Sequence, residues 1–242
     1  GNLRKIKKMT KTLLFGGSGF FGPVILSKDS NIISVGRTKP PSYCQNKHIQ
    51  INDLDELNKL DSIEFDKVIF LIGSSNHHDI NINIDMGIDF NVYPLNKALD
   101  YFSKKNLKKF ICFTTILLYD QKKIVIPVDE SQEINPFANK YIFSKYLSEQ
   151  IVKFYNRTVP SIIVRLSNIY GYTELRRPDL IPTIMLDVFE KEKVGRAYIK
   201  RWCPEKSQNE LDVQILNKHT SQQELLQMLN PCLSGKNIAL IT

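Results

Sequence analysis

Tyrosine followed four positions later by lysine is a pair that can move a proton, and this spacing recurs along the chain. Examples are YCQNK from Tyr43, YFSKK from Tyr101, YDQKK from Tyr119 and YIFSK from Tyr141. An unperturbed phenol titrates near ~10 and is a poor acid–base group at neutral pH. An ammonium one helical turn away stabilises the phenolate and lowers the pKa of the phenol. Such a pair can protonate a ketone oxygen while a hydride reaches the carbon, and its position in the fold has to show which pair does so.

Apolar runs that end in glycine or hydroxyl residues predict the strands that position these pairs. Five runs are typical of buried strands: TLLFG (12–16), NIISVG (31–36), KVIFLIG (67–73), KKFICFTT (108–115) and SIIVRLSNIYG (161–171). Apolar spacings of three and four predict a helix between the third and fourth runs, and another between the fourth and fifth. Alternating strands and helices indicate right-handed βαβ units, so the predicted fold class is α/β, a doubly wound parallel sheet of Rossmann type. Ligands bind at the carboxyl ends of such strands, which makes the residues after each strand the candidates for a site.

Position separates the pair in YIFSK from the others. Tyr141 and Lys145 begin a helix that follows a strand whose end supplies a hydroxyl, Thr115. The other pairs lie in a proline-flanked loop, at the end of the helix before the fourth strand, and in the loop after that strand. Tyr141 and Lys145 are therefore the predicted catalytic pair.

The segment GGSGFFG follows the first predicted strand and has the pattern GxxGxxG. In this pattern Gly16 permits a tight turn, Gly19 lets backbone amides approach a pyrophosphate, and Gly22 allows close packing of helix and strand. Pro23 suits the first turn of the following helix. A glycine-rich turn without a ligand is the alternative, but the location between a strand and a helix favours a dinucleotide.

Residues after the second predicted strand indicate which dinucleotide binds. NAD usually requires an acid there to hold the ribose diol, whereas this chain has Arg37, Thr38 and Lys39. A guanidinium pairs well with a 2′-phosphate, so Arg37, assisted by Lys39, favours NADP, with NAD as the alternative. The alternative interpretation is that Arg37 and Lys39 are ordinary loop cations that bind no phosphate.

Together these motifs resemble the extended short-chain dehydrogenase/reductase family, in its branch of sugar-nucleotide epimerases, dehydratases and reductases. The resemblance extends over roughly residues 12–185, and the matching segments are GGSGFFG, Asp53-Leu54, VIFLIG, Asn91-Val92, TTILLYD, YIFSK, RLSNIYG and RRPDLIPTIM. VIFLIG departs from the family's VIHLAA, and NVYPL departs from its NVxGT. Because the resemblance fades after residue 185, we expect a dinucleotide-binding domain over 1–171 and a small, shortened substrate-binding portion over 172–242.

The resemblance implies roles for residues at these matches. Tyr141 is the expected acid, Lys145 also binds the nicotinamide ribose, and Thr115 binds the substrate oxygen, with Thr114 as the fallback. Asn168 is expected to contact the sugar nucleotide, unless it only forms a turn. The expected cofactor-binding residues are Gly16, Gly19, Phe20, Phe21, Gly22, Arg37, Asp53, Leu54, Leu71, Ile72, Gly73 and Lys145. No metal is expected, because His77 and His78 lack a third ligand at a convincing spacing, and a solvated loop is predicted for them.

The residues after the predicted catalytic threonine bear on the reaction. Dehydratases of this family have an acid pair there, whereas this chain has Ile116 and Leu117, which disfavours dehydration. The expected reaction is NADPH-dependent reduction of a nucleotide-activated 4-keto sugar, which Arg37 favours. An NAD-dependent 4-epimerase is the alternative. A third hypothesis is a non-catalytic NADP-binding sensor or scaffold, because two of the family segments are degraded.

Composition is that of a globular chain, with 242 residues, 42% hydrophobic and 24% charged. No apolar run approaches the ~20 residues that span a membrane, so no membrane partner is expected. The net charge of +8 comes from lysines spread along the chain, which favours anionic small molecules over nucleic acid as partners. Four scattered cysteines without a CxxC motif indicate reduced thiols and a cytoplasmic protein. Relatives commonly dimerise through two long helices, so the resemblance implies a homodimer through residues 88–105 and 141–156.

Overall fold

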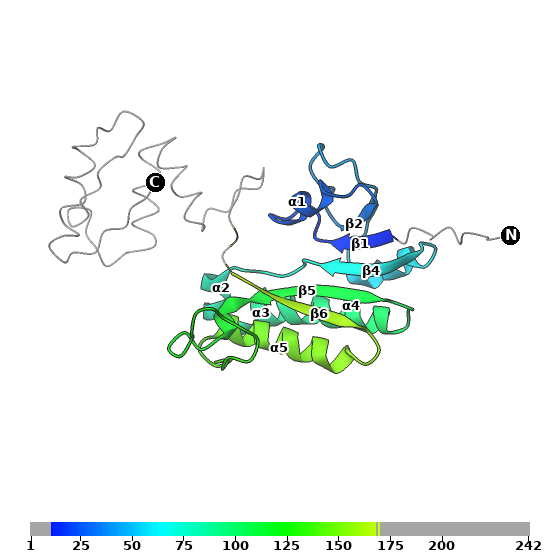
Figure 1. Cartoon of the computed structure of the whole chain (residues 1–242). Helices are drawn as coiled ribbons and strands as arrows, with labels where there is room; N and C mark the ends of the chain where they lie inside the picture. Colours follow the sequence, from blue (N-terminus) through cyan, green and yellow to red (C-terminus); the bar gives the residue numbers. More distant parts are fainter. Residues whose placement is uncertain (1–10, 168, 170–242) are drawn as a thin grey trace, which may run out of the picture. The chain divides into compact units, whose positions relative to one another are not determined.

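The computed structural model describes residues 11–167 and 169, in which helices pack on a parallel β-sheet (Figure 1). The strands are β1 (Lys11–Phe15), β2 (Ile32–Gly36), β3 (His48–Gln50), β4 (Phe65–Phe70), β5 (Lys109–Thr115) and β6 (Ser161–Leu166). Their order is β3-β2-β1-β4-β5-β6, and every neighbouring pair is parallel. The chain builds outwards from β1 in one direction and then from β4 in the other. This strand order is that of doubly wound dinucleotide-binding sheets, and it confirms the predicted fold class.

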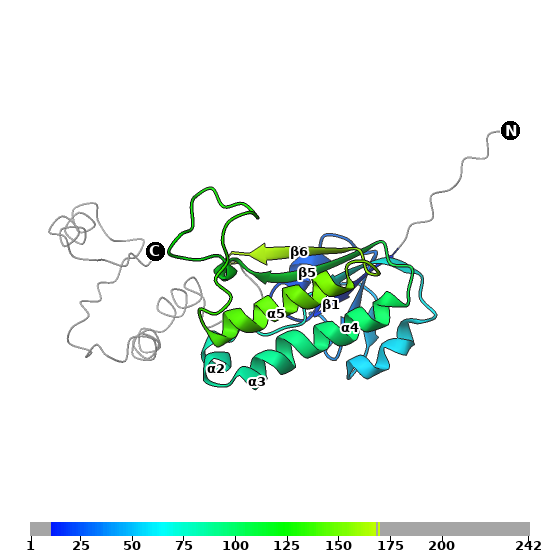
Figure 2. The same cartoon turned by 90° about the horizontal axis from the view of Figure 1, so that it is seen from below.

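Helical segments connect the strands. They are α1 (Gly22–Leu26), η1 (Leu54–Leu60), α2 (His77–Ile82), α3 (Ile84–Gly87), η2 (Ile88–Val92), α4 (Tyr93–Ser103), η3 (Ile116–Leu118) and α5 (Lys140–Tyr155). Helix α5 begins where Asn139 Oδ1 accepts a hydrogen bond from the Ile142 N–H at 2.9 Å. Helices α4 and α5 lie side by side against one face of the sheet (Figure 2).

The alternation of side chains along β1 shows that both faces of the sheet are covered. Leu13 and Phe15 point to one face, where they belong to the main core with Phe102 of α4. Leu14 points to the other face and packs with Leu26 of α1. Each of these side chains is at most 1% exposed, and full burial of such a side chain contributes roughly 1.5–3 kcal/mol. The central strand is therefore held from both sides, which fixes the turn that follows it.

Three differences from the sequence prediction concern β3, the end of β4 and the helix before β5. Strand β3 is not among the predicted strands, because three residues with one apolar side chain carry no periodic signal. The third predicted strand ends at Phe70, and Gly73, with φ +155°, departs from the extended conformation. The helix predicted before β5 contains a π-helical turn, η2, between α3 and α4. Such turns are frequent at functional sites.

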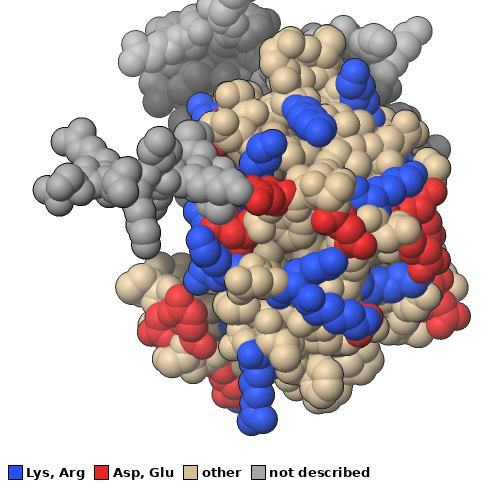
Figure 3. Space-filling model, turned by 90° about the vertical axis from the view of Figure 1, so that its right-hand side faces the viewer, with Lys and Arg blue, Asp and Glu red and all other residues tan. Residues whose placement is uncertain are grey.

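The side of the molecule on which the strands begin carries interspersed positive and negative side chains (Figure 3). Ion pairs at the strand starts join Lys105 to Asp61 at 2.7 Å and Lys108 to Asp66 at 2.8 Å. Charge of both signs is typical of a solvated surface. No helix in the described part of the chain combines the length and the apolar character needed to cross a membrane.

Candidate active site

The turn after β1 is so tight that three of its glycines, Gly16, Gly17 and Gly22, cannot accommodate a side chain without movement. Gly16 has φ +83°, a conformation that favours glycine, and a Cβ on it would lie 3.1 Å from the Cβ of Leu71. A Cβ on Gly22 would overlap the Gly16 carbonyl oxygen and lie 2.6 Å from the Cα of Gly17. A Cβ on Gly19 would meet only the Gly16 carbonyl oxygen, at 3.3 Å. The turn is closed against helix and strand but open at Gly19, a shape that fits a dinucleotide pyrophosphate.

Apolar side chains predicted to line the cofactor site share a similar exposure. All of them are half-buried: Phe20, Phe21, Leu54, Leu71 and Ile72. The ring of Phe21 meets that of Phe113 on β5 edge-on, with centroids 5.8 Å apart. Half-buried apolar groups at strand ends can cover the flat rings of a dinucleotide while remaining accessible to it.

The predicted adenosine-side residues follow β2 and β3. Arg37 and Lys39 are exposed directly after β2. Asp53 caps η1, because its carboxylate accepts a hydrogen bond from the Asp55 N–H at 2.9 Å. This hydrogen bond, assisted by the charge of Lys97, lowers the pKa of Asp53 below its ordinary value. Asp53 therefore organises the turn that follows β3.

Asn91, in the π-helical turn η2, connects the end of β4 with helix α5. Its Oδ1 accepts hydrogen bonds from the Ser74 N–H at 2.7 Å and from Lys145 Nζ at 2.9 Å. Its Nδ2 donates to Ser144 Oγ at 3.1 Å. A Cβ on Gly73 would lie 3.0 Å from Asn91 Oδ1 and 3.4 Å from Lys145 Nζ. The structure thus brings two predicted site residues, Gly73 and Lys145, together through Asn91, which the motif comparison marked only as a partial family match.

Lys145 lies one helical turn after Tyr141, with its Nζ 5.7 Å from the centre of the phenol ring. Burial lowers the pKa of Lys145 to about 8, and the nearby Cys112 opposes only part of this effect. Below that pH the lysine carries its charge in partly desolvated surroundings, where an ammonium stabilises a phenolate more strongly than in water. Lys145 is therefore equipped to lower the cost of deprotonating Tyr141.

Replacing Lys145 with methionine is expected to stabilise the cofactor-free protein at pH 7 by about 2 kcal/mol. The gain arises because methionine carries no buried charge, and one pKa unit corresponds to ~1.4 kcal/mol. The lost hydrogen bond to Asn91 offsets part of this gain. The unfolded chain keeps this proton up to the ordinary pKa of 10.5, whereas the folded protein releases it near 8. The advantage of methionine is therefore full below pH 8 and disappears as the pH rises to 10.5. Urea unfolding at both ends of this interval measures it.

The matched control for this variant is Lys153→Met, because Lys153 is an exposed lysine of the same helix. We expect the control to change the free energy of unfolding by less than about 0.5 kcal/mol. A Lys145→Met protein that is less stable than the wild type at pH 7 would show that burial does not penalise the Lys145 ammonium.

Tyr141 is buried between helix α2 and the end of β5. Its side chain is 3% exposed and packs with Ile80 of α2 and Leu118 of η3. Leu118 belongs to the short helix that Thr115 caps, so the end of β5 lies against the predicted acid. The imidazole of His77 stacks on the phenol, with ring centroids 3.9 Å apart and ring planes at 20°.

The solvated loop predicted for His77 and His78 is wrong. The two residues begin helix α2, although both side chains are exposed. Asn76 caps this helix: its Oδ1 accepts a hydrogen bond from the Asp79 N–H at 3.2 Å, and its Nδ2 donates to Asp79 Oδ2 at 2.6 Å. Asparagine followed three positions later by an acid resembles a capping box, and this is the signal that could have revealed the helix.

The two threonines at the end of β5 have different partners. Thr115 Oγ1 accepts a hydrogen bond from the Leu117 N–H at 3.2 Å. Thr114 Oγ1 donates to Glu149 Oε1 at 2.8 Å. A hydroxyl that accepts one hydrogen bond can still donate its own hydrogen, whereas the Thr114 hydrogen is committed to the carboxylate. This arrangement favours Thr115 over Thr114 as the donor to a substrate oxygen.

Glu149 is a buried charge that sequence reasoning missed. Its side chain is 1% exposed and accepts hydrogen bonds from Arg165 Nε at 2.9 Å and Nη2 at 2.8 Å. Arg165 also lies over the ring of Tyr119, 4.8 Å from its centre. The bidentate pair joins α5 to β6, and Thr114 joins the pair to β5. Spacing of four residues from Lys145 could have placed Glu149 on the sheet-facing side of the helix.

The pair formed by Tyr101 and Lys105 lies away from this site. Tyr101 Oη donates a hydrogen bond to Asp61 Oδ1 at 2.6 Å. Lys105 Nζ donates to the same oxygen at 2.7 Å, beside the starts of the strands. A pair that the sequence analysis did not single out, Tyr93 and Lys97 in YPLNK, begins helix α4, with Lys97 Nζ 5.0 Å from the Tyr93 ring centre. Among the pairs within the described residues, the one in YIFSK has the lysine that reaches the end of β4.

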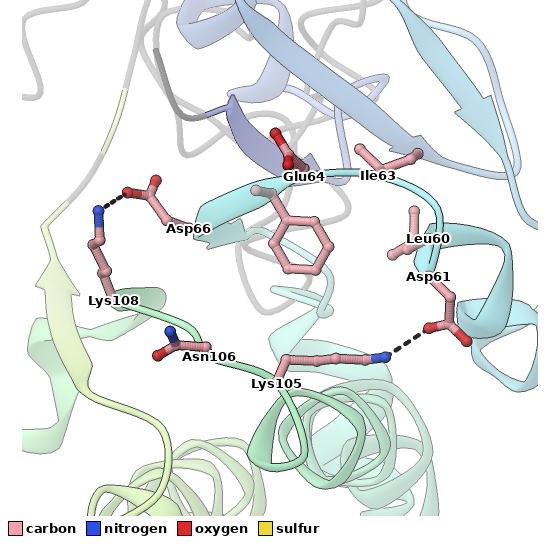
Figure 4. A pocket seen from close by; sticks show the side chains of 9 residues that line it. Leu60, Asp61, Ile63, Glu64, Asp66, Lys105, Asn106 and Lys108 are labelled. Carbon is pink, nitrogen blue, oxygen red and sulfur yellow. Dashed lines mark hydrogen bonds and ion pairs between the residues drawn. The ribbon is translucent and has the colours of Figure 1, made fainter. Parts of the chain in front are cut away.

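A pocket of about 490 Å³ lies where β4 begins, at the end of the sheet opposite the candidate site (Figure 4). Its lining residues are Leu60, Asp61, Ile63, Glu64, Phe65, Asp66, Lys105, Asn106 and Lys108. Both lysines are paired with carboxylates of the same pocket. Charges that compensate one another leave little to recognise a ligand, and the pocket does not belong to the site built by Tyr141 and Lys145.

Asn168 lies outside the described residues, as does the substrate-binding portion expected over 172–242, so their roles stay predictions. Across residues 11–167 and 169, no group of three or more His, Cys, Asp or Glu side chains is arranged to hold a metal ion.

Comparison with known proteins places this chain in a family. The model of the NAD dependent epimerase/dehydratase family matches residues 12–202, well over half of the chain. The chain belongs to this family, which confirms the resemblance to the sugar-nucleotide branch of the extended short-chain dehydrogenases/reductases. A curated relative from Methanocaldococcus jannaschii, a putative UDP-glucose 4-epimerase, is 28% identical over 176 residues, which are 66% of this chain and 56% of that protein. The chain thus spans about half the length of this relative.

Solved structures share the fold at lower identity. A UDP-glucose 4-epimerase structure has a TM-score of 0.65, with 21% identity over 76% of this chain and 62% of that one. The UDP-glucuronic acid 4-epimerase from Bacillus cereus, in complex with NAD, has a TM-score of 0.61 and 19% identity, covering 95% of this chain and 86% of that one. These likenesses support the Rossmann-type architecture.

Proposed function

We propose that the protein reduces a nucleotide-activated 4-keto sugar, with NADPH as the hydride donor and Tyr141 as the general acid. The observation that carries this proposal is the position of Lys145, whose Nζ lies 2.9 Å from Asn91 Oδ1 and beside Gly73 at the end of β4. The residues that would hold the dinucleotide are the glycines of the turn after β1, together with Gly73 and Lys145. When bound, the cofactor supplies the hydride.

The chain's own residues manage the proton. Tyr141 Oη gives its proton to the carbonyl oxygen, and the product is the alcohol once the carbon has received the hydride. The ammonium of Lys145 stabilises the phenolate that remains, and Asn91 holds that ammonium in place. Thr115 donates a hydrogen bond to the same substrate oxygen. The hydrophobic surroundings of Tyr141 strengthen each of these polar contacts.

Purified protein mixed with NADPH and a UDP-4-keto hexose tests the proposal through the loss of nicotinamide absorbance. UDP sugars are the first choice because the relatives are described as acting on them. We expect one NADPH to be oxidised for each sugar reduced. Absence of NADPH oxidation with every keto sugar offered would refute the reductase.

Replacing Arg37 with serine is expected to weaken NADP binding roughly 10–100-fold, since a hydrogen bond to a charged group such as the 2′-phosphate contributes ~1.5–3 kcal/mol. NAD binding is expected to stay within about twofold, because NAD lacks this phosphate. Arg37 is exposed after β2, and no acid occupies residues 37–39. Titration of both dinucleotides by fluorescence or calorimetry measures the effect. The control is Arg157→Ser, because Arg157 is an exposed arginine just after α5. Equal losses of affinity for NAD and NADP would contradict a role of Arg37 in binding the 2′-phosphate.

An NAD-dependent 4-epimerase is the second candidate, and the descriptions of the relatives favour it. Such an enzyme returns the hydride to the other face of the sugar and consumes no cofactor. Mass spectrometry of the dinucleotide that co-purifies distinguishes the two: tightly held NAD, together with interconversion of two UDP sugars without net oxidation, would establish the epimerase. A third candidate, a sensor or scaffold, binds the cofactor without either reaction.

The homodimer is a further part of this proposal. Helices α4 and α5 lie side by side, and large apolar side chains near them are exposed: Phe90 is 49%, Tyr93 53% and Phe154 77% exposed. Burying such groups against a second copy would remove them from water. Sedimentation of the full chain measures its mass in solution, and a monomer at all accessible concentrations would contradict the dimer.

A further inference from the structure

His77 covers a face of the Tyr141 phenol. The ring centroids are 3.9 Å apart and the planes differ by 20°, which is stacking rather than an edge contact. His77 is exposed, whereas Tyr141 is 3% exposed. The imidazole therefore lies between solvent and the proposed general acid.

The stacking partner is attached to the helix that carries Tyr141. The Tyr141 N–H donates to Asn81 Oδ1 at 2.9 Å, and Lys140 Nζ donates to the Ile82 carbonyl oxygen at 2.8 Å. Both acceptors belong to α2, which begins at His77. Because these hydrogen bonds join α2 to the first turn of α5, they fix the imidazole and the phenol relative to each other.

We propose that His77 is a positioning residue for Tyr141: its imidazole holds the plane of the phenol and excludes water from that face. The inference rests on the proposed function, in which Tyr141 gives a proton to the substrate. Stacked rings attract each other beyond the area that they bury. A phenol that can tilt spends less time in line with the carbonyl oxygen, and small misplacements of a reacting group reduce rates strongly.

Kinetics of two variants separate stacking from other roles of the histidine. We expect His77→Ala to lower kcat about 10-fold or more with KM for NADPH within about twofold, since misplacement affects the reaction rather than cofactor binding. His77→Phe keeps a flat ring and is expected to stay within about threefold of the wild type. His78→Ala, at the exposed neighbouring residue, should behave as the wild type. A wild-type kcat for His77→Ala, or a His77→Phe variant as slow as His77→Ala, would overturn the proposal.

Nuclear magnetic resonance tests the same contact without any substrate. The full chain is labelled with ¹³C in the tyrosine rings, and the Tyr141 signal is identified by its loss in Tyr141→Phe. We expect this signal to move in His77→Ala and to stay unchanged in His78→Ala. An unmoved signal in His77→Ala would overturn the positioning role. If the wild-type protein reduces no keto sugar, only the proposed function is refuted. The resonance shift then tests the contact between His77 and Tyr141 independently of activity.

Discussion

Tyr141→Phe is expected to lower turnover by a factor of roughly 10²–10⁴, the usual contribution of a positioned acid–base group. The variant keeps the ring that packs with Ile80 and Leu118 and loses only the hydroxyl that gives the proton. The affinity for the dinucleotide is expected to stay within about twofold, because Lys145 and the glycine turn are unchanged. Steady-state oxidation of NADPH, together with a separate binding titration, measures both quantities.

The control for this substitution is Tyr101→Phe, because Tyr101 has a lysine at the same spacing but binds Asp61 beside the strand starts. Loss of the Tyr101 hydroxyl is expected to lower the free energy of unfolding by about 1 kcal/mol and to leave kcat within about twofold. If Tyr141→Phe retained full turnover, Tyr141 would not be the acid. If neither the wild type nor the variant turned over any substrate while both bound the cofactor equally, the sensor or scaffold hypothesis would stand.

Strands and the glycine turn could be predicted because their signals are local. KVIFLIG and KKFICFTT are dense apolar runs, and GGSGFFG requires glycine for reasons that neighbouring residues impose. The structure shows the same turn closed at Gly22 and open at Gly19. Strand β3 escaped prediction because a three-residue edge strand depends on its partner β2 rather than on its own pattern.

Contacts of the candidate site were harder to predict because they join distant segments. His77 meets Tyr141 only when helix α2 docks on α5, and no periodicity in SSNHHDI reports this docking. Asn91 reaches Lys145 from a π-helical turn, whose altered register a simple helical pattern does not contain. Glu149 was overlooked because a charged residue on a helix usually faces solvent, and only its pairing with Arg165 allows it to be buried.

Arg165→Met is expected to lower the free energy of unfolding by roughly 3–5 kcal/mol, the cost of leaving one member of a buried ion pair without its partner. Glu149 is 1% exposed and Arg165 18% exposed in their side chains, so water cannot replace the guanidinium readily. Denaturant unfolding at neutral pH measures the loss. Lys104→Met is the control: its ion pair with Asp100 has side chains 69% and 54% exposed, and it should cost less than about 1 kcal/mol.

The double variant Glu149→Leu with Arg165→Met separates the value of the pair from the cost of a stranded charge. Apolar residues of similar size need no partner, so we expect the double variant to regain most of the stability that Arg165→Met loses. Thr114 loses its acceptor in the double variant, which limits the recovery by about 1 kcal/mol. If Arg165→Met alone costs no more than Lys104→Met, the carboxylate of Glu149 must have another source of stabilisation. In that case the ion pair would not be what fastens α5, and with it Tyr141 and Lys145, to the carboxyl ends of β5 and β6.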